Sequence, residues 1–334
     1  MSTTIVTQRQ PAISEQKSNM IQIIRAFAII AVALIHDCPP DEWQVYSRPF
    51  VNFAVAMFLF LSGYLTRDEH RDWKKFYFNR ISRVLIPYII WSLLYSIIMV
   101  KDASKLPFVL LTTTAYFHLY YVFVYIQFVL LTPLMLWLAK SKYRALGWLV
   151  TPVSIIAYMW YCHNMGQSPD VYVSIFWRDC CFGWFVFYYL GLMLGNKLID
   201  CRLSMKTLII LYLISMPLQM AEGYVLWKIG AEDFGGQLKL TAVISSVIAV
   251  LIAYKVLENG YVDIRNKYLR LLGDYSFGIY LSHLLIRIVL NHVPYYTSIF
   301  YPLNSIILVT ISLCFCYYGN KFLGKKVSRL LGLK

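Results

Sequence analysis

The sequence predicts an all-α, polytopic membrane protein with about ten transmembrane helices and with both termini in the cytoplasm. Of its 334 residues, 59% are hydrophobic and 14% are charged, whereas about 25% of the residues in a soluble domain are charged. The apolar residues come in runs of about twenty, long enough for a helix to cross a bilayer. Basic residues gather between alternate runs, which fixes an orientation.

The expected spans follow one another along nearly the whole chain. They lie at residues 19–37, 48–66, 79–99, 119–139, 146–163, 174–195, 206–227, 238–256, 273–292 and 299–320. Pro152 and Pro217 fall inside two of them, which membrane helices tolerate because neighbouring groups satisfy the freed backbone carbonyls. Residues 19–322 are therefore predicted to be the membrane domain, with cytoplasmic tails at 1–18 and 323–334.

The distribution of Lys and Arg supports this topology. With the amino terminus inside, 23 of the 31 basic residues belong to the inner tails and loops and 6 to the outer loops. This asymmetry follows the positive-inside rule. It also explains the net charge of +14 by proximity to anionic lipid headgroups. We therefore expect a lipid bilayer and no nucleic acid as a partner. The spacing of the seven cysteines matches no metal site, and no metal is expected.

Arg25 and His36 are polar exceptions in the first span, IRAFAIIAVALIHD at 24–37. Eleven positions correspond to about three turns plus roughly 20°, so the two side chains share one face and lie about 16 Å apart along the axis. An arginine within a span costs about 2.5–3.5 kcal/mol, which favours a functional role. Asp37 points about 100° away from His36 on an ideal helix. It can orient His36 only if the helix ends there, before Pro39.

A second signal is the pair Arg80 and Arg83 at the cytoplasmic mouth of the third span. Three positions apart, they share a helix face. One interpretation is that they are topogenic anchors, which are common at inner helix ends. The other is that the two guanidinium groups bind phosphate.

Five segments resemble elements of the membrane acyltransferase-3 family, bacterial integral-membrane acyltransferases that modify surface polysaccharides. They are Arg25 with His36 at R-x10-H spacing, MFLFLSGYL at 57–65, NRISRVLIPY at 79–88, FHLYYVFVYIQFVLLTP at 117–133 and LGDYSFGIYLSHLLI at 272–286. The chain departs from the family at Gln22, where an acidic residue is usual, and at Tyr120, where a tryptophan is usual.

The resemblance implies an O-acetyltransferase, an acyltransferase of groups other than aminoacyl groups, in the bacterial inner membrane. It would move an acetyl or other short acyl group from cytosolic acyl-CoA to a sugar hydroxyl. The acceptor would be an O-antigen, a capsule or exopolysaccharide unit, or a lipid-linked glycan. Acetyl-CoA is then a donor substrate, and no cofactor is permanently bound.

Roles for individual residues follow from this chemistry. Histidine titrates near neutral pH, so His36 is either the general base for the hydroxyl or the carrier of the acyl group. Arg25 would lie along the path of the acyl-CoA arm and Asp37 beside the base. The remaining candidates are Arg80 and Arg83 for the CoA phosphates, Ser62 and Tyr64 for the thioester or arm, and His118, Tyr121, Asp179 and His283 for the acceptor.

Other readings of the same residues stay open at this level. His118 and His283 also fit an interfacial histidine and a satisfied structural histidine, and Tyr121 fits an aromatic belt. Intramembrane Arg25 and His36 would also suit a transporter, as a substrate or proton pathway. Against a transporter, the sequence has no matched pair of interrupted helices. A non-catalytic scaffold would not need Arg25 within a span.

Overall fold

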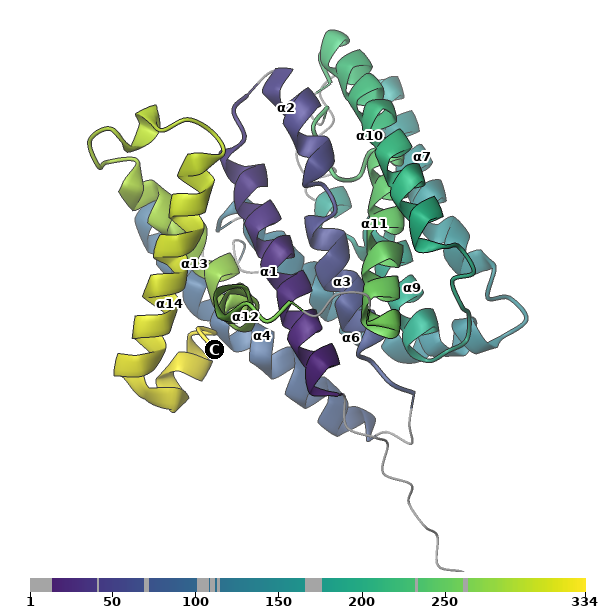
Figure 1. Cartoon of the computed structure of the whole chain (residues 1–334), viewed down its shortest axis with the longest axis horizontal. Helices are drawn as coiled ribbons and strands as arrows, with labels where there is room; N and C mark the ends of the chain where they lie inside the picture. The colour runs from purple at the N-terminus through teal and green to yellow at the C-terminus, as the bar shows by residue number, and fades with distance from the viewer. Residues whose placement is uncertain are drawn as a thin grey trace, which may run out of the picture.

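The computed structural model describes residues 14–40, 42–68, 72–100, 108, 112, 115–165, 176–231, 234–260 and 264–334. In these ranges the chain forms a bundle of helices and contains no strand (Figure 1). The elements are α1 (Glu15–Asp37), α2 (Glu42–Ser47), η1 (Arg48–Phe50), α3 (Ala54–Tyr64), α4 (Trp73–Tyr95), η2 (Ser96–Val100), η4 (Phe117–Leu119), α6 (Tyr120–Lys140), α7 (Leu146–Met165), η5 (Cys181–Trp184), α9 (Phe185–Gly195), α10 (Met205–Lys228), α11 (Leu240–Asn259), α12 (Lys267–Asp274), α13 (Ser276–Leu290), η6 (Tyr296–Ser298) and α14 (Leu303–Leu330).

The all-α polytopic membrane class is confirmed. Within the part of the chain that the structure describes, seven helical segments are long and apolar enough to cross a membrane. Three shorter apolar helices, at Leu146–Cys162, Cys181–Gly195 and Ser276–Leu290, lie where three further spans are predicted. The total of ten spans stays a prediction.

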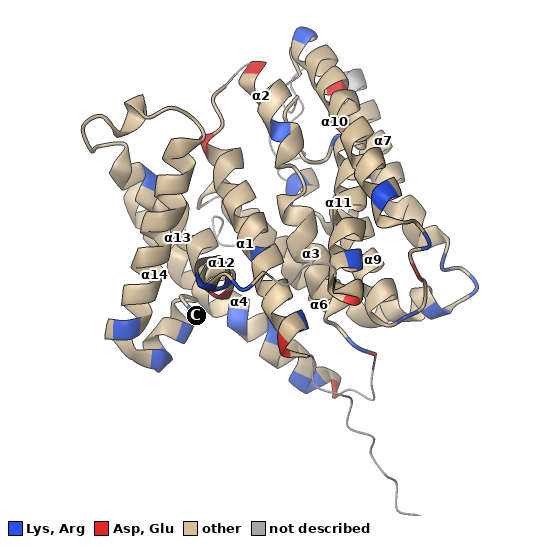
Figure 2. Cartoon of the chain, in the orientation of Figure 1, with Lys and Arg blue, Asp and Glu red and all other residues tan. Residues whose placement is uncertain are grey.

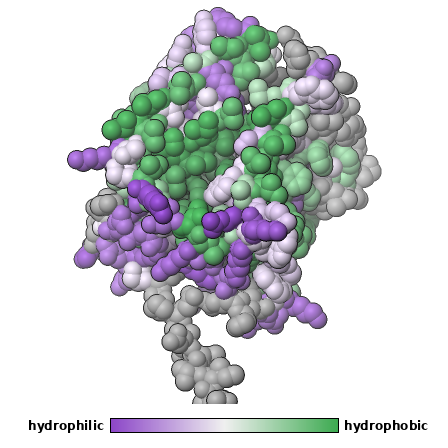
Figure 3. Space-filling view, turned by 90° about the vertical axis from the view of Figure 1, so that its right-hand side faces the viewer, coloured by the Kyte–Doolittle hydropathy of each residue, from purple (hydrophilic) through white to green (hydrophobic). Residues whose placement is uncertain are grey.

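Side chains on the outside of the bundle suit a lipid environment. Figure 3 shows a broad band of hydrophobic side chains on one face, with hydrophilic side chains gathered below it. Leu213 and Leu218 on α10 are 62% and 55% exposed, and Trp137 on α6 is 61% exposed. Large apolar side chains exposed in this number would be a liability in water, so the bilayer is the solvent that this surface fits.

The two ends of the bundle differ in charge. Lys and Arg side chains gather at the end where α1 begins, which also holds the carboxyl terminus (Figure 2). We call this the inner end and the opposite one, where α1 finishes, the outer end. That the inner end faces the cytoplasm stays a prediction of the positive-inside rule. Residues 1–13 of the predicted amino-terminal tail, and the outer-loop residues Lys101 and Lys105, lie outside the described residues.

The first helix carries its own start and stop signals. The Ser14 hydroxyl accepts a hydrogen bond from the Lys17 backbone N–H at 3.2 Å and caps the start of α1. The helix finishes at Asp37, because Pro39 and Pro40 follow and cannot continue it. Asp37 is therefore the last residue of α1. Its side chain leaves the helix in a different direction around the axis from that of His36.

The second predicted span, at 48–66, corresponds to the candidate membrane span Glu42–Tyr64, which begins earlier than predicted. The helical segment starts at Glu42 and is interrupted by the 3-10 turn η1, which contains Pro49. Proline lacks an N–H and cannot extend the α-helical hydrogen bonds through this point. The interruption lets Arg48 turn back to α1, where its Nη1 donates to the Ile35 carbonyl at 3.3 Å.

The carboxyl-terminal segment predicted as a tail folds back onto the bundle. Helix α14 is kinked at Gly324, whose φ of 74° lies in the left-handed region that glycine adopts readily. Beyond the kink, Leu333 is 1% exposed, and the Trp91 indole donates to the Leu331 carbonyl at 2.9 Å. These contacts attach the end of the chain to α4.

Helices α3 and α9 approach each other at glycines. A Cβ atom on Gly63 would lie 2.2 Å from the Tyr188 carbonyl oxygen, and one on Gly191 would lie 2.3 Å from the Phe60 carbonyl oxygen. Gly195, four residues after Gly191, meets the backbone of Tyr64 in the same way. This is the small-residue packing by which membrane helices gain close contact, and it gives Gly63 of the SGYL segment a packing role.

We expect Gly191→Leu to force α3 and α9 apart, because the new side chain would overlap backbone that cannot move aside. The loss of stability should be about 1–3 kcal/mol or more, seen as a lower Tm of the detergent-solubilised protein. Ala221→Leu adds a comparable side chain at an exposed position on α10 and should leave Tm nearly unchanged. Equal Tm values for the two variants would contradict close α3–α9 packing.

Candidate active site

A cavity of about 1280 Å³ lies inside the bundle. Its wall is formed by residues of α1, η1, α3, α4, η4, α6, α7, α10, α12 and α13 and by the segments that lead into η5 and α11. Arg25 of α1 and Asp274 of α12 line it, and so do Arg48, which contacts the Ile35 carbonyl near the end of α1, and Lys239. The cavity therefore follows α1 across much of the bundle.

Arg25 and His36 both line this cavity, as their shared helix face predicts. The Arg25 Nη1 donates to the Gln22 side-chain oxygen at 3.4 Å. Asp274 of α12 also lines the cavity and lies close enough to attract the Arg25 charge. A carboxylate from a helix distant in the sequence thus stands near Arg25, although the expected acidic residue is missing at position 22.

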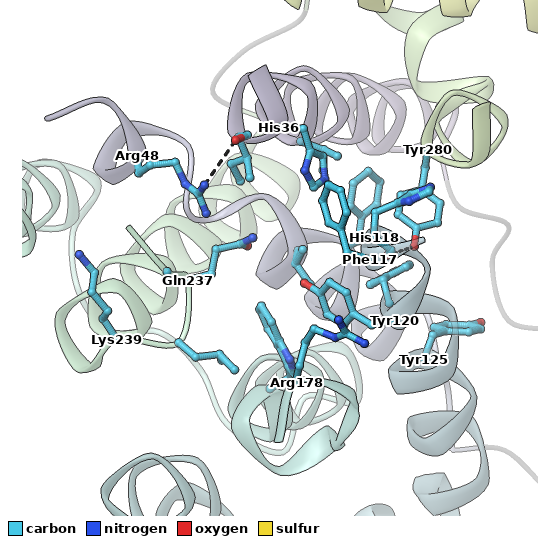
Figure 4. Close-up of a pocket in the computed structure, with 18 of the residues that line it drawn as sticks. His36, Arg48, Phe117, His118, Tyr120, Tyr125, Arg178, Gln237, Lys239 and Tyr280 are labelled. Atoms are coloured by element: carbon cyan, nitrogen blue, oxygen red, sulfur yellow. Dashed lines mark hydrogen bonds between the residues drawn. The ribbon is translucent and has the colours of Figure 1, made fainter. Parts of the chain in front are cut away.

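Three histidines meet at the outer part of α1. The ring centroid of His36 lies 5.3 Å from that of His283 and 6.4 Å from that of His118. The centroids of His118 and His283 are 5.3 Å apart. The three rings come from α1, η4 and α13, and Figure 4 shows His36 and His118 beside Phe117 and Tyr280. The fold therefore brings together three imidazoles separated by up to 247 positions in the chain.

Hydrogen bonds define the proton position on His283. Its Nδ1 lies 2.8 Å from the Tyr280 carbonyl and 3.1 Å from the Ile279 carbonyl. A carbonyl only accepts, so Nδ1 carries the hydrogen and Nε2 of the neutral ring is an acceptor. Among the described side chains, this buried Nε2 has no hydrogen-bond partner. It is an available proton acceptor inside the cluster.

His118 and His36 also keep ring nitrogens available. Both nitrogens of His118 are buried, and neither has a partner in the part of the chain that the structure describes. The backbone of His118 is held in place, because the Tyr280 hydroxyl donates to its carbonyl. Buried polar atoms without partners are uncommon and call for an explanation such as catalysis or a bound ligand. His36 and His118 line the cavity, so a ligand there can reach them.

Asp37 pairs with Arg287 on α13. The Arg287 Nε lies 2.8 Å from Oδ1 of Asp37, whose side chain is 2% exposed. No hydrogen bond between Asp37 and His36 occurs among the residues described. The ion pair instead joins α1 next to His36 to α13 one turn after His283. It thereby holds together the two helices that supply these rings.

The other predicted residues divide into two groups. Ser62, Tyr121 and His118 line the cavity. Tyr64 is fully buried at the inner end, where its hydroxyl donates to Glu258. Asp179 is buried and pairs with Arg178 at 2.7 Å. The roles predicted for these residues stay predictions.

Arg80 and Arg83 lie at the inner end of α4, outside the cavity wall. The Arg80 guanidinium sits over the Phe76 ring at 5.3 Å, and Arg80 is half-buried while Arg83 is exposed. Val84, one turn after Arg80, lines the cavity. The pair thus lies just outside the cavity wall, one turn or less before Val84.

Several lining residues were not predicted. From the sequence, Arg48 and Lys239 are placed only among the outer-loop charges, and Glu222, Asp274 and Tyr280 are not singled out as wall residues. The position of the charged residues in the sequence could have indicated this role. Each charge lies at or inside the end of an apolar run, where exposure to lipid would cost free energy, and this favours a place inside the bundle. Asp274 and Tyr280 also fall in the quoted segment LGDYSFGIYLSHLLI.

Comparison with known proteins defines the class. The model of the acyltransferase-3 family, described as an acyltransferase domain, matches residues 19–320. The chain therefore belongs to the acyltransferase-3 family, a family of multi-pass membrane acyltransferases.

Individual relatives are more distant. Proteins from Staphylococcus aureus strains Mu50 and MSSA476 are named probable poly-beta-1,6-N-acetyl-D-glucosamine export protein. Each is 22% identical to this chain over 284 residues, which covers 81% of this chain and 78% of the relative. No solved structure matches the chain.

The Asp37–Arg287 pair provides a test of how the histidine helices are held. Arg287→Gln leaves the Asp37 carboxylate buried without its cation and should cost about 3 kcal/mol. The double variant Asp37→Asn with Arg287→Gln removes both charges and should recover part of the lost Tm. Lys140→Gln breaks the exposed Lys140–Asp68 pair and should cost less than about 1 kcal/mol. A double variant as unstable as Arg287→Gln alone would contradict the role of the Asp37–Arg287 ion pair in holding α1 and α13 together.

Proposed function

We propose that this membrane acyltransferase transfers an acetyl or other short acyl group from cytosolic acyl-CoA to a sugar hydroxyl of a surface polysaccharide or its lipid-linked precursor. The bacterial inner membrane is the proposed location. The observation that supports this most strongly is the cavity along α1, which is lined by both Arg25 and His36. It offers one path for a donor from the inner end and an acceptor from the outer end.

The donor would enter from the inner end. Arg80 and Arg83 lie toward the inner end of α4, where their guanidinium groups would bind the phosphates of CoA. The thin arm would then extend past Ser62 and Arg25, both of which line the cavity. The thioester would come to rest near His36, about 16 Å further along the helix.

The histidine cluster supplies the base. In the direct route, His36 takes the proton of the sugar hydroxyl as its oxygen attacks the thioester carbonyl. The carbon–sulfur bond breaks, and the CoA thiol leaves with that proton. In the covalent route, the His36 nitrogen attacks the thioester carbonyl, the carbon–sulfur bond breaks, and CoA leaves as its thiol with the imidazole proton, which gives an acyl-imidazole. The sugar hydroxyl then attacks the acyl carbon, the carbon–nitrogen bond breaks, and the hydroxyl proton returns to the imidazole. In either route the unpaired Nε2 of His283, whose ring lies 5.3 Å from His36, can accept a proton from the neighbouring ring.

The relatives support a polysaccharide acceptor. Their name connects them with export of poly-beta-1,6-N-acetyl-D-glucosamine. We infer from this that the substrate of the present protein is also a glycan. The same name favours a second candidate function, movement of a glycan across the membrane through the cavity. The two functions differ in whether an acyl group is transferred to the glycan.

Inside-out vesicles that contain the protein distinguish these functions and test His36. Given acetyl-CoA labelled in the acetyl group, the wild-type protein should place label on lipid-linked glycan. His36→Ala should lower this transfer by about 10²–10⁴-fold but still bind a non-transferable acyl-CoA analogue, because Arg80 and Arg83 lie at the other end.

His292→Ala serves as the matched control. His292 is exposed on the outer side and does not line the cavity, so label transfer should be unchanged. Substantial transfer by His36→Ala would exclude the proposed mechanism. Movement of unmodified glycan without label transfer would favour export.

The donor site is tested by removing the paired charges. Arg80→Ala with Arg83→Ala should raise KM for acyl-CoA, and the double lysine variant should recover only part, because lysine keeps the charge but loses the planar fork. Lys74→Ala with Lys75→Ala removes two exposed charges from the same helix end and should leave KM near the wild-type value. Unchanged KM in the Arg80 and Arg83 alanine variant would assign that pair to topology alone.

A further inference from the structure

The outer part of the cavity is lined by three basic side chains. Arg48 comes from η1, Arg178 precedes η5, and Lys239 immediately precedes α11. Figure 4 shows them on the walls of one open space, with Gln237 between Arg48 and Lys239. We call this part of the cavity, with Glu222, the outer chamber. Of the carboxylates found in the described cavity wall, Glu222 belongs to this chamber and Asp274 lies near Arg25.

Lys239 shows that the charge of the chamber is built into the fold. It is 7% exposed, and its Nζ donates to the Gln219 carbonyl at 3.4 Å. Within the described ranges no carboxylate oxygen lies within 4.0 Å of this ammonium. The Glu222 carboxylate accepts instead from the backbone N–H and the hydroxyl of Thr241. Glu222 is close enough to attract the Lys239 charge but does not contact it. A buried ammonium without a direct carboxylate partner is costly, and an anion bound beside it would lower that cost.

The surroundings of Lys239 are rigid. The Asn52 side-chain amide donates to Gln219 Oε1 at 2.7 Å, and the Gln219 amide donates to the Ser245 hydroxyl at 2.6 Å. Asn52, Gln219 and Ser245 are all buried and connect three helical segments. This network holds the carbonyl that Lys239 contacts, so the ammonium position is defined before any ligand arrives.

The remaining wall suits a sugar. Tyr158 and Trp177 stack with ring centroids 4.8 Å apart, and the Arg178 guanidinium lies 5.8 Å from the Tyr120 ring. All four residues line the cavity. Gln237 contributes a buried side-chain oxygen that, among the residues described, has no hydrogen-bond donor. Apolar walls with a few convergent polar groups are typical of small-molecule sites, and an amide oxygen can accept from a sugar hydroxyl.

We propose that the acceptor is an anionic glycan whose carboxylate or phosphate binds in the outer chamber. This inference rests on the proposed transferase function and specifies its substrate class. Arg48 connects the chamber to the histidines, because it donates to the carbonyl of Ile35, the residue before His36. An oxyanion held by Arg48 and Lys239 would place a neighbouring sugar hydroxyl at the His36 end of the chamber.

The anion has two possible sources with the same chemistry. It is either a carboxylate on the sugar or the pyrophosphate of a lipid carrier. Matched acceptors separate them: a uronate-containing oligosaccharide, its methyl ester, and the neutral oligosaccharide with and without a polyprenyl pyrophosphate. Wild-type protein should use at least one anionic acceptor about tenfold better, in kcat/KM, than its neutral counterpart.

Variants at Lys239 test the chamber itself. Lys239→Met keeps the buried stem without the charge and should raise KM for the anionic acceptor about tenfold, with KM for acyl-CoA unchanged. Lys239→Arg should keep most of the preference. Lys228→Met removes an exposed outer lysine that does not line the cavity and serves as the control. Direct binding of the uronate oligosaccharide, measured without acyl-CoA, should weaken in Lys239→Met and in high salt.

Each outcome bears on the proposal. Equal use of anionic and neutral acceptors by the wild type, or the same preference in Lys239→Met, would overturn it. A raised KM for acyl-CoA with an unchanged KM for the acceptor would assign the chamber to donor phosphates and overturn it as well. If no acceptor is acylated while the uronate still binds in a Lys239-dependent manner, the transferase function fails and the anion site stands.

Discussion

The structure depends on one constraint, which is that the polar face of α1 cannot face lipid. Arg25 and His36 lie on a helix that is otherwise apolar, and a charged group within a bilayer is costly unless protein or water surrounds it. Other helices therefore enclose this face rather than pack tightly against it. The cavity of about 1280 Å³ is the result, and it follows the polar face of α1 through the bundle.

Two contacts give this enclosure its shape. Glycine packing brings the backbones of α3 and α9 together, which forms a compact wall on one side of α1. On the other side, the Asp37–Arg287 ion pair joins α1 to α13. Because Asp37 follows His36 and Arg287 lies one turn after His283, the same pair that stabilises the helix contact also aligns the two imidazoles.

The two ends of the cavity differ in their charged side chains. The inner end has Arg25 with Asp274 nearby, and the Arg80 and Arg83 pair lies just outside. The outer end has Arg48, Arg178 and Lys239 in its wall. Under the proposed function, the histidines between these ends would meet a donor from one side and an acceptor from the other.

The sequence by itself determined the membrane class, most of the helix positions, the shared face of Arg25 and His36, and the family. Each of these follows from composition, local periodicity or the order of short motifs. Only the tertiary structure decided that His118 and His283 join His36, that Asp37 pairs with Arg287, and that Arg48 and Lys239 line a chamber. It also decided the interruption at Arg48–Phe50. Helix periodicity specifies which way a side chain points from its own axis, but which helix it meets depends on how distant segments pack and rotate against one another.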